Sequence, residues 1–130
     1  MDSEDEMVVR PLRVLEAQED GKRKSVLVTY SVPKLQMPCD CHACRPFIGI
    51  AVFVLDGRSW NVESREDMIT QSGGFGHPAR DFHLIQLGPR RIGIEMTDSE
   101  DAQGETKTLK AIFVAWSGKV VEAVHWFCPR

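Results

Sequence analysis

The sequence lacks an excess of positive charge. Its 16 lysines and arginines are outnumbered by 19 aspartates and glutamates, which gives a net charge of -3. A protein that binds nucleic acid needs a basic stripe to neutralise phosphates, and no such stripe is present in the sequence. We therefore expect no nucleic-acid partner.

Long apolar runs are also missing. No run reaches the roughly 20 residues that a membrane-spanning helix requires, so we expect no membrane span. The N-terminus has neither the basic nor the apolar region of a secretory signal. If the chain is the complete natural product, its location is cytoplasmic. An exported domain behind a new Met1 would have the same sequence, so the localisation stays open.

Complete cofactor motifs are absent as well. The glycine-rich segment 72–78 matches neither a phosphate-binding loop nor a dinucleotide fingerprint, so we expect a mobile connection there. The acidic segment 98–105 lacks the alternation and central glycine of a calcium-binding EF-hand. We expect no cofactor, with zinc as the one exception left open.

Strand-like segments separated by glycine and proline fill most of the chain. They predict one mainly β domain over residues 7–130, after an acidic flexible tail at 1–6. We expect an antiparallel sheet or meander, folded as a sandwich or half-barrel, with at most one short helix. That helix is expected at 65–71, because Ser64 and Asp67 resemble a capping box. The expected strands are 7–16, 25–32, 47–55, 58–63, 82–87, 91–97, 106–116 and 119–127.

The segment Phe47 to Leu55 is the most apolar in the chain. A continuous apolar run predicts a central strand that is covered on both faces. The pair Asp56-Gly57 predicts a type I′ hairpin turn after it, and Ser117-Gly118 predicts a second hairpin. Trp60, Trp116 and Trp126 are expected in the core or at its edge.

Three cysteines and a histidine crowd the loop before this strand. Cys41 and Cys44 have the spacing of half a zinc knuckle, and Cys39, His42 and the distant Cys128 would complete the ligand set. A second knuckle is missing. A disulfide within the loop, or between Cys39 and Cys128, is therefore the main alternative if the protein is exported. Buried free cysteines are the third interpretation.

Several short motifs resemble a group of small bacterial proteins, many of them exported, for which we know no established activity. The main one is a Cys-His-Ala-Cys motif before an apolar strand. The resemblance implies a bacterial source and a periplasmic or exported location, and it implies nothing about catalysis. The matching residues are Cys41-His42-Ala43-Cys44-x-Pro46-x-x-Gly49-x-Ala51-x-Phe53, Trp60-x-Val62-Glu63-Ser64, Gly74-x-Gly76, Ile85-x-Leu87-Gly88 and Gln103-Gly104.

The acidic segment 98–105 is the expected interaction surface. We expect it to be a loop held between two strands with its carboxylates in water, where it would steer a basic partner. The hypothesis is a non-catalytic module that binds another protein, such as a basic toxin or enzyme, as a bacterial inhibitor or immunity protein. The alternatives are a zinc- or thiol-dependent enzyme that uses the Cys39–Cys44 loop with His42 or His77, and a structural envelope protein. The partner-binding candidates are Asp98, Glu100, Asp101, Glu105, Phe75 and His77.

Overall fold

The structure is a computed structural model that describes residues 6–34, 44–74, 76–102 and 104–128, without the side chains of 100–102, 105, 127 and 128. The prediction of a mainly β fold is confirmed, and no helix in the described ranges is long and apolar enough to cross a membrane. The strands are β1 (Met7–Glu19), β2 (Lys22–Pro33), β3 (Phe47–Asp56), β4 (Ser59–Gln71), β5 (Asp81–Gly88), β6 (Arg91–Ala102), β7 (Glu105–Trp116) and β8 (Lys119–Cys128).

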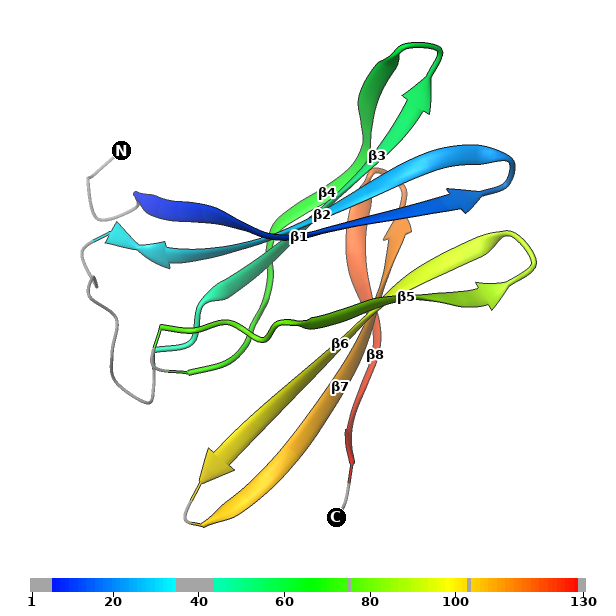
Figure 1. Cartoon of the computed structure of the whole chain (residues 1–130). Helices are drawn as coiled ribbons and strands as arrows, with labels where there is room; N and C mark the ends of the chain where they lie inside the picture. The colour runs from blue at the N-terminus through cyan, green and yellow to red at the C-terminus, as the bar shows by residue number, and fades with distance from the viewer. Residues whose placement is uncertain (1–5, 35–43, 75, 103, 129–130) are drawn as a thin grey trace.

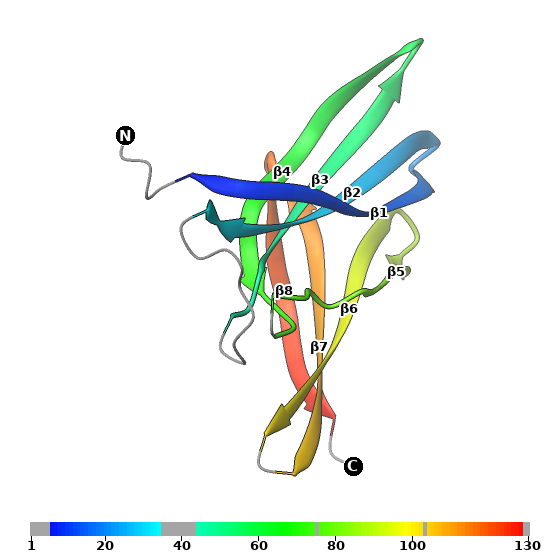
Figure 2. The ribbon, with the colours of Figure 1, turned by 60° about the vertical axis from the view of Figure 1, so that its left-hand side comes forward.

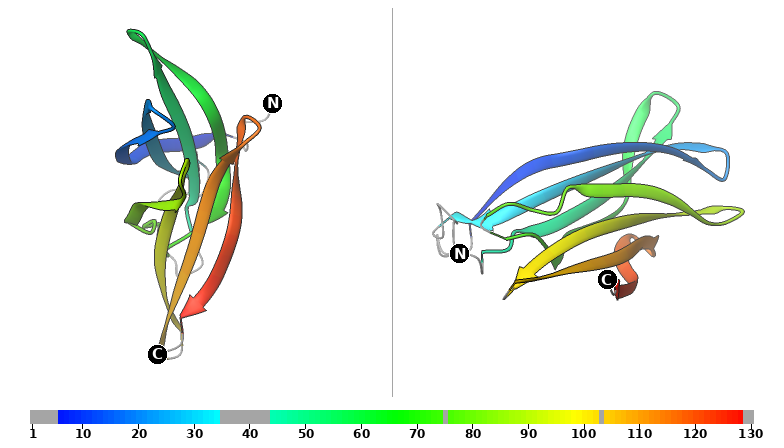
Figure 3. Two further views of the ribbon diagram at one scale, coloured as in Figure 1. Left: turned by 90° about the vertical axis from the view of Figure 1, so that its right-hand side faces the viewer. Right: turned by 60° about the horizontal axis from the view of Figure 1, so that its bottom comes forward.

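The strands form two antiparallel sheets of four strands each. The orders are β1-β2-β3-β4 and β5-β6-β7-β8, so each sheet is a meander. Figure 1 and Figure 3 show the two sheets as packed layers. At one side of the sandwich the backbone N–H of Arg65 in β4 donates to the carbonyl of Gly118, at 3.1 Å. In each antiparallel meander the two tight hairpin turns lie at the same end of the sheet, and the bond from the N–H of Ile92 to Glu19 places the β5/β6 turn beside the β1/β2 turn.

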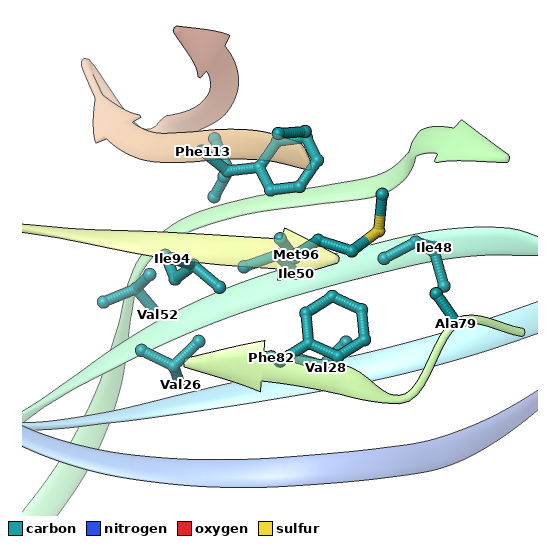
Figure 4. Packing of buried hydrophobic residues seen from close by; sticks show 12 residues of the cluster. Val26, Val28, Ile48, Ile50, Val52, Ala79, Phe82, Ile94, Met96 and Phe113 are labelled. Carbon is teal, nitrogen blue, oxygen red and sulfur yellow. The ribbon is translucent and has the colours of Figure 1, made fainter. Parts of the chain in front are cut away.

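The hydrophobic core lies between the inner faces of the two sheets. Alternate residues of each strand point inward, as the two-residue period of a strand requires. Figure 4 shows Phe82 of β5 beside the valines of β2, with Met96 of β6 next to the isoleucines of β3. The buried cluster comprises Val26, Val28, Ile48, Ile50, Val52, Ala79, Phe82, Ile94, Met96, Ala111, Phe113 and Val120.

The central strand β3 is covered on one face only. It lies between β2 and β4, as a central strand should, and Ile48, Ile50 and Val52 are buried in the core. Phe53 has the opposite strand parity and is only half-buried. The expectation that both faces are covered is therefore wrong, because the second sheet packs against just one side of the first.

Two further local predictions are also wrong. Residues 65–71 are not a helix but belong to β4, where pairing with β3 outweighs the capping signal. The first hairpin predicted by turn chemistry is present, but its loop residues are Gly57-Arg58, because Asp56 pairs with Ser59. Only Gly57 has a positive φ, of 64°, which is the pattern of a type II′ turn.

The hairpin predicted at Ser117-Gly118 is confirmed. Both residues have positive φ, of 51° and 80°, as a type I′ turn requires. The same geometry occurs at Asp20-Gly21, with φ of 52° and 78°. Aspartate and glycine suit such a turn, so this pair of residues was a hairpin signal in the sequence.

Candidate functional site

The segment after the cysteine loop is tied to the glycine-rich segment, and together they form what we call the corner (residues 44–46 and 72–79). The carbonyl of Cys44 accepts from the N–H of Gly76 at 2.9 Å, and that of Pro46 accepts from Ser72 at 3.0 Å. The buried Ser72 hydroxyl accepts from the N–H of Ala79 at 3.0 Å. These bonds fix the corner through its backbone.

Gly73 explains why the corner needs glycine. Its φ is +78°, and a Cβ there would lie 1.8 Å from the carbonyl oxygen of His77. Gly74 and His77 exchange two backbone hydrogen bonds of 3.0 Å, so the chain reverses tightly at this point. Any side chain at position 73 would break this turn. The described part of the glycine segment is therefore a hydrogen-bonded turn, and the expectation of a mobile connection is wrong for it.

Asp98 locks the corner onto the second sheet. Its Oδ2 accepts from the N–H of Gly73 at 3.0 Å and from Nη2 of Arg45 at 3.4 Å. Arg45 Nε also donates to the carbonyl of Gly73 at 3.2 Å. Asp98 is 6% exposed, so the expectation that its carboxylate faces water is wrong. A buried carboxylate requires such partners, and the corner supplies them.

The structure describes the side chains of only some of the other partner-binding candidates. The acidic segment is not a loop, because β6 continues to Ala102 and β7 begins at Glu105. Glu100, Asp101 and Glu105 thus lie in strands, and their side chains are outside the described residues. Phe75 also lies outside the described residues, whereas His77 is described and exposed.

Most of the residues expected to bind zinc or to form a disulfide lie outside the described residues. Cys39, Cys41 and His42 are outside the described residues, and so is the side chain of Cys128 at the end of β8. Cys44 is buried in the corner and has an interaction partner. The residues that are described contain no group of three or more metal-ligating side chains. The zinc and disulfide hypotheses therefore stay predictions.

An apolar groove runs across the outer face of the first sheet, opposite the core; we call it the outer groove. Its volume is about 470 Å³, and all four strands contribute to it, including Leu27 and Phe53. Three more of its apolar side chains are strongly exposed: Val9 at 60%, Val62 at 53% and Met68 at 53%. A contiguous apolar surface of this kind is typical of an interaction site.

The described residues that line the outer groove present no unpaired charge. Its charged side chains are Arg65 and Asp67, both in β4. Nε and Nη2 of Arg65 donate to the two oxygens of Asp67 at 3.1 and 2.9 Å. This pairing raises the pKa of Arg65, first through the hydrogen bonds and then through the charge of Asp67. The groove is therefore suited to an uncharged, apolar occupant.

A partly buried ion cluster lies at the end of the core near the tight turn between β1 and β2. Lys24 follows the inward parity of Val26 and Val28, and its ammonium contacts carboxylate oxygens of Glu19 and Glu63. Burial lowers the pKa of Lys24, but the two hydrogen bonds and charges outweigh burial and raise it. Burial raises the pKa of Glu19, but Lys24, the N–H of Ile92 and Arg91 together lower it. Lys24 and Glu19 therefore remain ionised near neutral pH.

Two tryptophans are not where the sequence suggested. Trp60 is 43% exposed and Trp116 is 60% exposed, so their placement in the core is wrong. Each has an arginine over its ring: Arg23 lies 5.9 Å from the centroid of Trp60, and Arg91 lies 5.2 Å from that of Trp116. Both rings lie at strand ends, because Trp60 is the second residue of β4 and Trp116 is the last residue of β7.

The outer groove was also missed from the sequence, although a signal existed. Ala51, Phe53 and Leu55 share one face of β3, and Val62 of β4 pairs with Phe53. One face of two adjacent strands was thus already apolar in the sequence. Comparison with known proteins adds nothing to this, because no family model, curated protein or solved structure matches the chain. The resemblance to exported bacterial proteins stays a prediction.

Proposed function

We propose that this protein is a non-catalytic binding module that holds an uncharged, apolar segment of another protein in the outer groove. The observation that carries the proposal is the groove itself: an apolar concavity of about 470 Å³ on a sheet face that the second sheet does not cover. Apolar side chains that remain exposed after folding contribute little to stability, and their clustering favours a role in binding.

The charges of the groove select the type of partner. Arg65 and Asp67 satisfy each other, so a charged segment would have to break their bidentate pair to gain a partner. An apolar segment leaves that pair intact and covers Val9, Val62 and Met68. We therefore propose a partner with an apolar surface ridge, in the manner of an inhibitor or immunity protein and its target.

The acidic strands have a smaller role in this proposal. Asp98 is engaged in the corner and is not available to a partner. Glu100, Asp101 and Glu105 would then act on the association rate with a basic partner, and the groove would supply the affinity.

Photo-crosslinking tests the proposal directly. A photoreactive phenylalanine analogue is placed at Val62 or Met68 in the outer groove, and at Val124 on β8 as the control; Val124 is 46% exposed and belongs to the other sheet. We expect the two groove positions to capture the same partner protein from the source cells, and the control position not to capture it. Equal capture at all three positions, or capture only of a second copy of this chain, would contradict the proposal.

The alternative functions that use the cysteine loop are tested by determining whether its cysteines bind metal, form a disulfide or stay reduced. A disulfide that involves the Cys39–Cys44 loop is our proposal for how that loop is held, since Cys44 is anchored in the corner. Metal analysis together with a free-thiol count on native protein separates the cases. Stoichiometric zinc with all four thiols reduced would favour the zinc- or thiol-dependent enzyme and would contradict the disulfide. A structural envelope protein would show neither turnover nor specific capture in the groove.

A further inference from the structure

We propose that the end of the sandwich that carries the four tight turns docks on an anionic lipid bilayer surface. We call this end the hairpin end and define it as residues 19–24, 56–60, 88–91 and 116–119. It is separate from the outer groove, and the proposal does not depend on the proposed function. Figure 1 and Figure 2 show the turns between β1 and β2, between β3 and β4, and between β5 and β6 projecting at this end.

Charge is segregated at the hairpin end. Its four segments contain seven of the 16 lysines and arginines but only three of the 19 aspartates and glutamates. Lys24 and Glu19 are paired with each other in the ion cluster, so we do not count them among the exposed charges. The remaining exposed charges of the hairpin end are two carboxylates, Asp20 and Asp56, and six cations. Those cations are Lys22, Arg23, Arg58, Arg90, Arg91 and Lys119.

The fold creates this basic surface, since the sequence shows no basic stripe. The four turns are far apart in the chain, and contacts link each of them to a neighbour; the 56–60 turn is linked to the first turn by Arg23 over the ring of Trp60. The N–H of Ile92 donates to Oε2 of Glu19 at 2.7 Å, and Arg90 Nε lies 3.8 Å from Oδ1 of Asp20. Arg91 donates to the carbonyl of Ala115 at 3.3 Å, which fixes it beside Trp116. A net charge of -3 for the whole chain therefore conceals a positive end.

The exposed tryptophans indicate what kind of anionic surface fits. Trp60 and Trp116 lie at two different turns, each with its own arginine over the ring. A protein interface usually has a contiguous apolar centre depleted of charge, which these separated rings do not form. Tryptophan at the boundary of apolar and polar phases, flanked by basic side chains, is typical of contact with lipid headgroups. Projecting tips suit a flat surface better than a nucleic-acid strand, which requires a groove along its backbone.

Vesicle flotation of the full chain tests the proposal. The probes are vesicles of phosphatidylcholine mixed with phosphatidylserine, and vesicles of phosphatidylcholine alone, each at low and at high salt. We expect binding to the anionic vesicles at low salt, weakened by salt, and a blue shift of tryptophan emission on binding. Absence of binding to the anionic vesicles, or equal binding to both kinds, would overturn the proposal.

A matched pair of variants locates the surface. R58Q/R90Q/K119Q removes three exposed charges from three turns, and R10Q/R80Q/K107Q removes three exposed charges elsewhere. We expect the first variant to bind anionic vesicles about 100-fold more weakly and the second to bind within a few-fold of the unaltered protein. Equal losses in both variants would show that net charge alone attracts the chain, which overturns a specific surface. Binding to polyglutamate as tight as to the vesicles, and lost in the first variant, would instead identify a site for an acidic protein.

Discussion

The two faces of the first sheet contrast sharply although both are apolar. On the inner face, Val26, Val28, Ile48 and Ile50 are buried against the second sheet. On the outer face, Val9, Val62 and Met68 line a groove that nothing in the described structure covers. Apolar composition alone therefore does not distinguish a strand face that holds the fold together from one that remains open for binding.

The ends of the two faces differ as well. The inner face is closed at one end by the Lys24 cluster and at the other by Asp98 with Arg45, so buried and partly buried charges border the core. Each of these charges has its partners in place, which a position between two sheets requires. Among the described residues that line the outer groove, the only charged ones are the exposed pair Arg65 and Asp67. The inner face is thus bordered by paired charges that fix how the two sheets pack, whereas the outer face stays accessible to a partner.

Two phenylalanines give the largest expected contrast between the faces. Phe82 is fully buried in the core, whereas Phe53 is half-buried on the outer face. We expect Phe82→Ala to lower the free energy of unfolding by about 3–5 kcal/mol through loss of burial and an unfilled cavity. Phe53→Ala should cost about 1–2 kcal/mol, because much of that ring remains in contact with water. Chemical denaturation of both variants gives the two values, and equal losses would remove the distinction.

The ion cluster is expected to have the next largest effect. Lys24→Met should lower the free energy of unfolding by about 3 kcal/mol, because Glu19 and Glu63 lose their cation in a partly buried site. Lys34→Met is the control: its partner Glu6 is on the surface, so the change should cost under about 1 kcal/mol. If urea titrations show that both substitutions cost the same, Lys24 is not a closing element of the core.

The same cluster predicts a dependence of stability on pH. The pKa of Glu19 is lowered in the folded state, so its contribution is present above the ordinary glutamate pKa and is lost as pH falls through the folded value. The pKa of Lys24 is raised, so its contribution is present below the ordinary lysine pKa and is lost as pH rises through the folded value. Melting temperatures of the unaltered protein should fall at both extremes. Lys24→Met should flatten the fall on the alkaline side, and an unchanged alkaline slope would count against this assignment.

Asp98 is expected to have a smaller effect. Asp98→Ala removes the acceptor for the N–H of Gly73 and the partner of Arg45, so we expect a loss of about 2 kcal/mol in the free energy of unfolding. Asp67→Ala removes an exposed partner of Arg65 and should cost under about 1 kcal/mol. Thermal denaturation of the two variants compares a carboxylate that closes the core with one that lies in the open groove. A loss for Asp98→Ala no larger than that for Asp67→Ala would mean that the corner is held by its backbone bonds alone.

Much of the fold was predictable from the sequence because strand periodicity and turn chemistry are local. The alternation of Val26 and Val28, and the Ser117-Gly118 turn, required no knowledge of distant residues. The state of Asp98 did not follow from the sequence, because its partners Gly73 and Arg45 are 25 and 53 residues away. Neither did the exposure of Phe53, since it depends on where the second sheet packs. Local patterns reveal strands, whereas burial of a given face is decided by tertiary packing.

The double variant V62E/M68E tests the central claim most directly. It places charges on the rim of the outer groove at two positions that are each 53% exposed. Its association with the crosslinked partner is measured by calorimetry, and its unfolding is measured in parallel. We predict at least about a tenfold loss of affinity, with a melting temperature within a few degrees of the unaltered protein. Unchanged affinity, or a loss of stability as large as that of Phe82→Ala, would contradict an outer face that is left open for binding.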